Sequence, residues 1–90
     1  MINVDLLGIK YKRINVGVTG TGDATIDLSS ITGTIILTYI IGFANSVGND
    51  HVKAIIPYNN LGDTSNVMHK IRVIADNGTT TYVDVMVLYI

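Results

Sequence analysis

β-Branched side chains constrain the fold of this chain more than any other feature of its sequence. Val, Ile and Thr supply 34 of the 90 residues, whereas Glu and Gln are absent and Ala occurs only four times. Branching at Cβ restricts χ1 against the preceding turn of a helix but suits the pleated surface of a sheet. Because residues that favour helices are scarce, we expect residues 1–90 to form a single all-β domain, a small antiparallel β-sandwich or barrel.

The segments VMHKIRVIA and TTTYVDVMVLYI flank Asp76-Asn77-Gly78, which is a strong turn signal. A two-residue turn at Asn77-Gly78 would place Asp84 opposite Ile71. A three-residue loop with Gly78 in the left-handed conformation instead separates an apolar face from a polar one, and pairs Lys70 with Asp84. In that register Val67, His69, Ile71 and Val73 lie opposite Val87, Val85, Val83 and Thr81. Since register follows the hydrophobic pattern, we predict a C-terminal hairpin over residues 67–90 with the three-residue loop.

Two other segments allow more detailed predictions. Residues 34–41 are apolar at both alternating sets of positions, which is typical of a central strand buried on two sides. The apolar alternation in residues 9–18 shifts phase at Lys12-Arg13, which indicates a β-bulge. Pro57 marks the end or the edge of a strand.

The candidate chemical motifs favour a protein that is not an enzyme, with no catalytic, cofactor or metal site predicted. The glycines of GVTGTG precede an alternating strand, whereas a dinucleotide fingerprint requires a helix there. His51, beside Asp50, lacks a third partner at metal or catalytic spacing, and His69 is expected in the core or an interface. Two alternatives stay open at the loop from Asn59 to Asn66 and the residue before it. One is calcium binding by the oxygen ligands Asn59, Asn60, Asp63 and Asn66. The other is sugar binding, with the Tyr58 ring as a stacking surface and the two asparagines after it as amide donors.

Charge and hydropathy exclude several classes of partner. The net charge is −1 and the pI is near 6.0, so a general nucleic-acid interface is not expected. Lys10, Lys12 and Arg13 form the only basic cluster and are interpreted as a solvated strand face. The most apolar stretch, residues 34–44, is about half the length of a membrane-spanning helix, and the first residues do not resemble a secretory signal. Because the chain has no cysteine, neither disulfides nor thiol-ligated zinc can hold the domain, and its redox compartment cannot be inferred.

The chain has little charge with which to cover its surface. A monomer of 9.7 kDa exposes roughly 5,000 Å², yet only 14% of the residues are charged, against about 25% in typical domains. The segment ends in Leu88, Tyr89 and Ile90, which lie beyond the residues paired in the predicted hairpin. We therefore predict that Leu88, Tyr89 and Ile90 form an interface with another copy of the chain.

The segment NGTTTYVDVMVLYI, rich in Thr after the turn and alternating to an apolar end, resembles small β-structured virion proteins of tailed bacteriophages, especially tail-fibre and receptor-binding modules. The segment TIDLSSITGT and the scarcity of charge are similar to these proteins as well. The resemblance covers about a third of the chain and carries over no functional residue. It implies a homo-oligomer, often a trimer, located in the virion beside other virion proteins. The expected function is therefore a structural or host-attachment module, and the alternative is a carbohydrate-binding module that binds a host-surface glycan through its loops.

Overall fold

Strands account for most of the residues that the computed structural model describes, which are residues 8–59 and 67–90. Within these ranges there is no α-helix, and the expectation of an all-β fold is confirmed. The regular elements are, in chain order, β1 (Lys10–Thr19), β2 (Gly22–Thr25), β3 (Ile35–Asn45), the 3₁₀ turn η2 (Asn49–His51), β4 (Val52–Tyr58), β5 (Lys70–Ala75) and β6 (Thr80–Tyr89).

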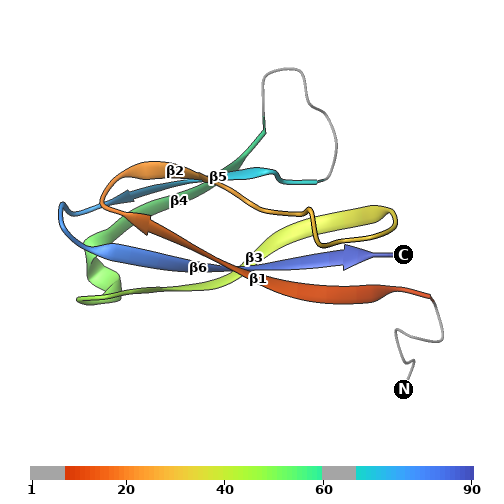
Figure 1. Cartoon of the computed structure of the whole chain (residues 1–90). Helices are drawn as coiled ribbons and strands as arrows, with labels where there is room; N and C mark the ends of the chain where they lie inside the picture. The colour runs from red at the N-terminus through yellow and green to blue at the C-terminus, as the bar shows by residue number, and fades with distance from the viewer. Residues whose placement is uncertain (1–7, 60–66) are drawn as a thin grey trace.

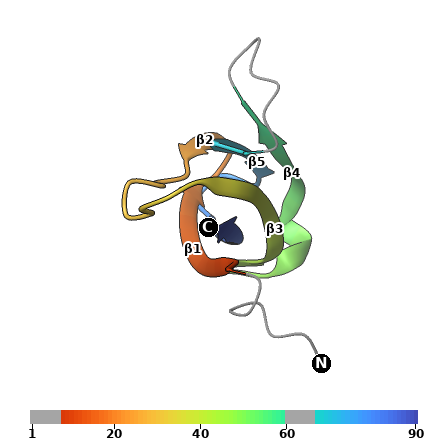
Figure 2. The same ribbon diagram turned by 90° about the vertical axis from the view of Figure 1, so that its right-hand side faces the viewer.

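The strands form two three-stranded sheets that lie one on the other as two layers (Figure 1). Sheet A has the order β1-β6-β3, and sheet B has the order β2-β5-β4. Each neighbouring pair is antiparallel. Viewed along the strands, β6 lies between β1 and β3, and sheet B covers one side of this layer (Figure 2). The prediction of a small antiparallel β-sandwich is therefore confirmed.

The two central strands supply most of the core. Val83, Val85 and Val87 of β6 and Ile71 and Val73 of β5 are fully buried. They alternate with residues that are more exposed, because successive side chains of a strand point to opposite faces of the sheet. Full burial of one such side chain stabilises the fold by about 1.5–3 kcal/mol. Contact between the inner faces of β5 and β6 therefore holds the two layers together.

The chain changes sheet at four connections between strands, and three of them, all but the one from β2 to β3, are turns that lie together at one end of the sandwich (Figure 1). β1 leads into β2 through Gly20, β3 into β4 through η2, and β5 into β6 through Gly78. Backbone hydrogen bonds join these turns. The Gly20 N–H donates to the Thr79 carbonyl over 2.7 Å, and the Asp76 N–H donates to the His51 carbonyl over 3.1 Å. The turn between β5 and β6 is therefore hydrogen-bonded to both of the other turns at this end.

The pairing predicted for the C-terminal hairpin, residues 67–90, is wrong. β5 pairs with β2 and β4, whereas β6 pairs with β1 and β3, so the two strands face each other across the core. Asp84, expected opposite Lys70, lies opposite a residue of β1. The turn itself follows the prediction, because Gly78 has a φ of 77°. No other residue type has a positive φ in the described ranges, which excludes the two-residue turn that requires positive φ at Asn77 as well.

β3 is an edge strand, whereas residues 34–41 were predicted to be a central strand buried on both sides. In the described part of the chain, β3 is paired with one other strand, which is β6. The prediction failed because a run of apolar residues does not by itself distinguish a central strand from an edge strand. Five large apolar side chains of β3 are exposed, namely Ile36, Leu37, Tyr39, Ile41 and Phe43.

The structure places the bulges of sheet A on β3 and not on β1. The register between β3 and β6 shifts between Ile35 and Leu37 and again between Ile40 and Gly42. β1 pairs with β6 without a shift, so the bulge predicted at Lys12-Arg13 is wrong. The phase change in β1 arises because Tyr11 is an exposed aromatic residue on the outer face of the sheet.

Residues 88–90 lie inside sheet A and not beyond it. Leu88 lies opposite a residue of β1 on one side and a residue of β3 on the other, and Tyr89 packs against the core. Ile90 exchanges two backbone hydrogen bonds of 2.9 Å with Thr34. The inference that these residues lack cover within one chain is therefore wrong. The interface predicted at Leu88, Tyr89 and Ile90 stays a prediction. The Ile90 side chain is exposed and is therefore available for such a contact.

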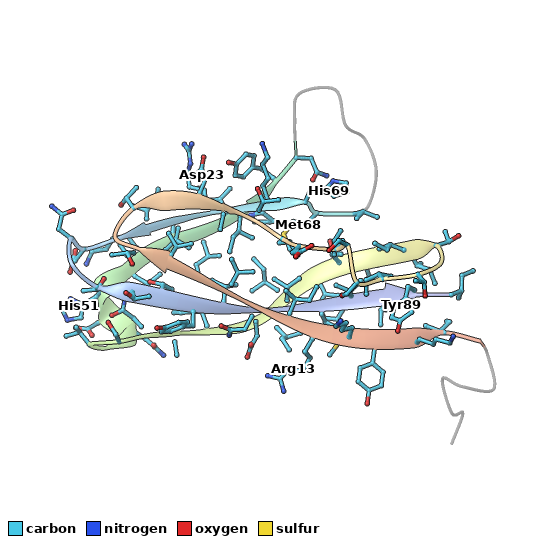
Figure 3. All side chains as sticks on the ribbon, viewed as in Figure 1. Arg13, Asp23, His51, Met68, His69 and Tyr89 are labelled. Atoms are coloured by element: carbon cyan, nitrogen blue, oxygen red, sulfur yellow. The ribbon has the colours of Figure 1, made fainter. Side chains whose placement is uncertain are left out.

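One side chain links the two sheets directly at the end opposite the three crossings. The Thr38 hydroxyl of β3 donates to the Met68 carbonyl over 3.1 Å, and the Met68 N–H donates to the same hydroxyl over 2.5 Å. Both residues are buried, and Met68 precedes β5 between the two layers (Figure 3). Thr38 thereby satisfies both backbone polar groups of a buried residue.

Candidate interaction surface

The motifs singled out in the sequence serve structural roles. Gly20 of the glycine run has a φ of 63° and forms the turn between β1 and β2. The His51 Nδ1 atom lies 2.9 Å from the Asp76 Oδ2 atom, so the partner of His51 is Asp76 and not its neighbour Asp50. His69 was predicted in the core or in an interface. It is exposed, which contradicts the core alternative, because the alternation changes phase just before β5; the interface alternative stays a prediction. The catalytic interpretation of Asp50 and His51 gains no support from this arrangement.

The loop from Asn59 to Asn66 falls mostly outside the described residues, and so do the calcium ligands considered at positions 60, 63 and 66. Asn59 itself is described. Its Nδ2 atom donates to the Val67 carbonyl over 2.8 Å, and its Oδ1 atom accepts from the His69 N–H over 2.7 Å. The Asn59 amide therefore joins the two ends of the loop, and these contacts use the groups that were considered for a sugar.

A polar cluster on the outer face of sheet B holds Tyr58. Arg72 donates to both carboxylate oxygens of Asp23, over 2.7 Å and 3.1 Å. The Arg72 guanidinium also lies 5.8 Å from the centre of the Tyr58 ring. Hydrogen bonds from Arg72, and secondly from Tyr58, lower the pKa of Asp23 to about 2. These contacts hold the Tyr58 side chain in place. A hollow of about 210 Å³ lies beside it and is lined by Ile56, Tyr58 and Arg72.

The outer face of sheet A carries three exposed tyrosines. Because the inner positions of β6 are buried, the residues between them point outward together with their partners on β1 and β3. Tyr11, Tyr39 and Tyr82 each expose a large part of their rings. We call this surface the tyrosine face, which consists of Tyr11, Arg13, Asn15, Gly17, Leu37, Tyr39, Gly42, Ala44, Tyr82, Asp84, Met86 and Leu88.

A small polar network occupies the middle of the tyrosine face. Arg13 donates to Asp84 over 2.8 Å, and Asn15 donates to the other oxygen of the same carboxylate over 2.9 Å. The hydrogen bonds from Asn15 and then from Arg13 lower the pKa of Asp84. Arg13 points away from the interior of the sandwich (Figure 3). The basic cluster is therefore exposed, as predicted, but Arg13 is paired with an acid.

Tyr82 lies against a strand residue that has no side chain. A Cβ atom added to Gly17, its partner on β1, would lie 3.3 Å from the Tyr82 ring. An aromatic ring that covers a cross-strand glycine shields the backbone there and restrains the ring. Sequence reasoning missed this face because Tyr11, Tyr39 and Tyr82 are far apart in the chain. Alternation in each strand was the signal that could have placed them on one surface.

An apolar groove separates the two edge strands β3 and β4. Its volume is about 430 Å³, and its lining is almost entirely apolar, with Lys53 as the exception. The groove reaches Ile40 and Ile55, which pack against the core. The sandwich is therefore less well covered along this side. The lining residues are Ile40, Phe43, Val52, Lys53, Ala54 and Ile55.

Comparisons of the chain with protein-family models, with curated proteins and with solved structures found no match. Among residues 8–59 and 67–90, no three His, Asp, Glu or Cys side chains gather as metal ligands would. In the same residues, no helix has the length and apolar character needed to cross a membrane. Two surfaces of the described part are candidate functional features, namely the tyrosine face and the edge of β3.

Proposed function

We propose that this chain is a non-enzymatic structural or host-attachment module that assembles with copies of itself. The observation that carries the proposal is the concentration of exposed apolar side chains on one sheet. Of the large hydrophobic side chains that are exposed in the described residues, most belong to sheet A or its end, including all five on β3. The five on β3 come from neighbouring positions of one strand, and exposed apolar side chains that gather in one place are characteristic of interaction sites.

The location of this assembly in a phage virion rests on the resemblance of the segment from Asn77 to Ile90 to tailed-phage virion proteins. Low charge and a Thr-rich strand surface are consistent with a subunit that is covered by neighbours. Mass spectrometry of purified particles from the source of the sequence tests the location. Detection of this chain at a copy number that is a multiple of its oligomeric state supports it, and its absence from intact particles contradicts it.

Light scattering across a dilution series tests the assembly itself. We expect a mass that is a multiple of 9.7 kDa at high concentration and dissociation on dilution. To test the proposed contribution of Leu88, Tyr89 and Ile90, the change Ile90→Lys is preferable to deletion, because deletion would also remove backbone pairing with β1 and β3. A full-length chain that remains a monomer at all concentrations contradicts the proposed assembly.

The tyrosine face supports carbohydrate binding as a second candidate function. The exposed tyrosines provide stacking surfaces. The Arg13 guanidinium beside them is 61% exposed and donates to Asp84 with one of its five N–H groups, so its other N–H groups can serve as donors to a sugar. This site lies on the sheet and not on the loops, where Asn59 is already engaged. A glycan array with the wild-type chain and with Tyr82→Ala tests it. Binding by the wild type that the variant loses supports the candidate, and no binding by the wild type contradicts it.

A further inference from the structure

The four sheet edges of the sandwich differ in how they are protected against pairing with another chain. Exposed edges usually carry charged residues, especially Lys, or Pro, or are very short. β1 carries Lys10, Lys12 and Arg13. β2 has only four residues and includes Asp23, and β4 carries Lys53 and Pro57. Three of the four edges therefore have features that discourage the addition of a strand.

β3 has neither charge nor proline. Its sequence, IILTYIIGFAN, extends over 11 residues, which makes it the longest strand in the described ranges. Five of its apolar side chains are between 37% and 43% exposed. Its two bulges interrupt the ladder with β6, and bulges are themselves a protective feature. In β3, however, they fall at Ile36 and Ile41, so the extra residues add to the exposed apolar surface.

We propose that β3 pairs edge to edge with β3 of a second copy, antiparallel and about a two-fold axis, so that sheet A continues through both subunits. This inference rests on the proposed function, because it supplies the contact through which the copies assemble. Two identical strands in antiparallel orientation form an isologous interface, which closes after two subunits. It therefore specifies a dimer and not the trimer that the resemblance implies.

The exposed side chains of β3 set an upper limit to the area that this contact can bury. A large side chain has a surface of about 200 Å², so the five exposed side chains of β3 present roughly 400 Å² in each copy and roughly 800 Å² in the pair. With the paired backbone and the flanking Val47, which is 65% exposed, this upper limit lies near the roughly 1,000 Å² at which specific interfaces begin. The contact therefore corresponds to a dimer that dissociates on dilution.

Charge also favours a second copy as the occupant of this edge. A strand with no charged residue can approach an identical strand without electrostatic repulsion. It also has no charge with which to select a strand of opposite sign. The pairing would cover the edge beside Phe43, which lies at the rim of the apolar groove between β3 and β4.

A pair of matched substitutions tests the proposal by sedimentation velocity. Ile41 on β3 and Ile56 on β4 are the same residue type on two edge strands and are 42% and 43% exposed. Ile41 lies one residue from the middle of β3, so in a dimer whose axis passes through the middle of the strand Ile41→Lys would bring two lysines close together. We expect its dissociation constant to rise by more than about tenfold, whereas Ile56→Lys keeps the wild-type value. Circular dichroism establishes that both variants keep their strand content.

The outcomes separate this inference from the proposed function. A wild-type chain that stays a monomer contradicts both, and leaves the β3 edge to a different protein. A wild-type oligomer that Ile41→Lys does not weaken, or one with the mass of three copies, contradicts the β3 pairing alone.

A second measurement does not depend on the folding of the lysine variant. The chain has no cysteine, so single cysteines placed at Leu37, Tyr39 and Phe43 can report distances between copies. Antiparallel pairing about an axis predicts that disulfide cross-linking is strongest at one position and falls in both directions along the strand. Equal cross-linking at all three positions, or none at any of them, overturns the proposal.

Discussion

The hydroxyl of Thr38 provides a direct test of how the two sheets are joined. The change Thr38→Val replaces the hydroxyl with a methyl group of similar volume and leaves the Met68 N–H and carbonyl without their partner. A buried polar group that loses its hydrogen bond costs about 1–3 kcal/mol. With two such groups, we expect the free energy of unfolding to fall by roughly 2–4 kcal/mol, which corresponds to a decrease in Tm of roughly 10–25 °C in a domain of this size.

The assay is urea unfolding followed by circular dichroism at a fixed protein concentration, since self-association would add to the apparent stability. Thr38→Ser is the matched control, because it keeps the hydroxyl and removes only a methyl group. We expect it to retain most of the wild-type stability. A Thr38→Val variant as stable as wild type, or more stable than the serine variant, would refute the role of this hydroxyl as the link between the sheets.

Three further predictions concern backbone conformation and pH. Gly78→Ala should destabilise the fold by on the order of 1 kcal/mol, because φ is positive there, and Asn77→Ala should cost less; urea titration compares the two. Gly33→Ala should lower the Tm more than Gly78→Ala, since its φ is 119° and its Cβ would lie 2.3 Å from the Ile90 carbonyl oxygen; an equal or smaller effect would contradict the close approach. The pKa of Asp23 is lowered from 3.8 to about 2 in the folded state, so its contribution to stability is present above pH 3.8 and is lost as the pH falls toward 2. Asp23→Asn should therefore be less sensitive to pH in this range, and identical acid-unfolding curves would contradict this.

Residue types and alternation were sufficient to predict the fold class, the inward-facing residues of β5 and β6 and the turn at Gly78. They were not sufficient to predict which strands pair. A hairpin and a crossing between two sheets place the same alternate residues, such as Ile71 and Val85, toward an apolar environment. In a hairpin the second strand lies beside the first in one sheet, whereas in a crossing it is rotated about its axis and lies in the facing sheet. The alternation of apolar residues is the same in both cases and does not distinguish them.

The surface was harder to predict than the core for a similar reason. The apolar run in residues 34–41 has the pattern of a buried strand, but β3 lies at an edge, and nothing in its own residues distinguishes burial within a chain from burial between chains. The salt bridges were missed because Asp84 and Asp23 find their partners on β1 and β5, and that choice depends on the order of strands in each sheet.

The position of β6 in the middle of sheet A affects the order in which the chain can fold during synthesis. β1 and β3 are each paired only with β6 in the described structure, and β6 is the last of the three to be made. Until residues 80–89 have left the ribosome, both earlier strands lack their partner, and the uncharged edge of β3 is available to neighbouring nascent chains. Slow translation upstream of β6 should therefore increase aggregation, whereas a circular permutation that places β6 between β1 and β3 in sequence should reduce it, because local contacts form faster than distant ones.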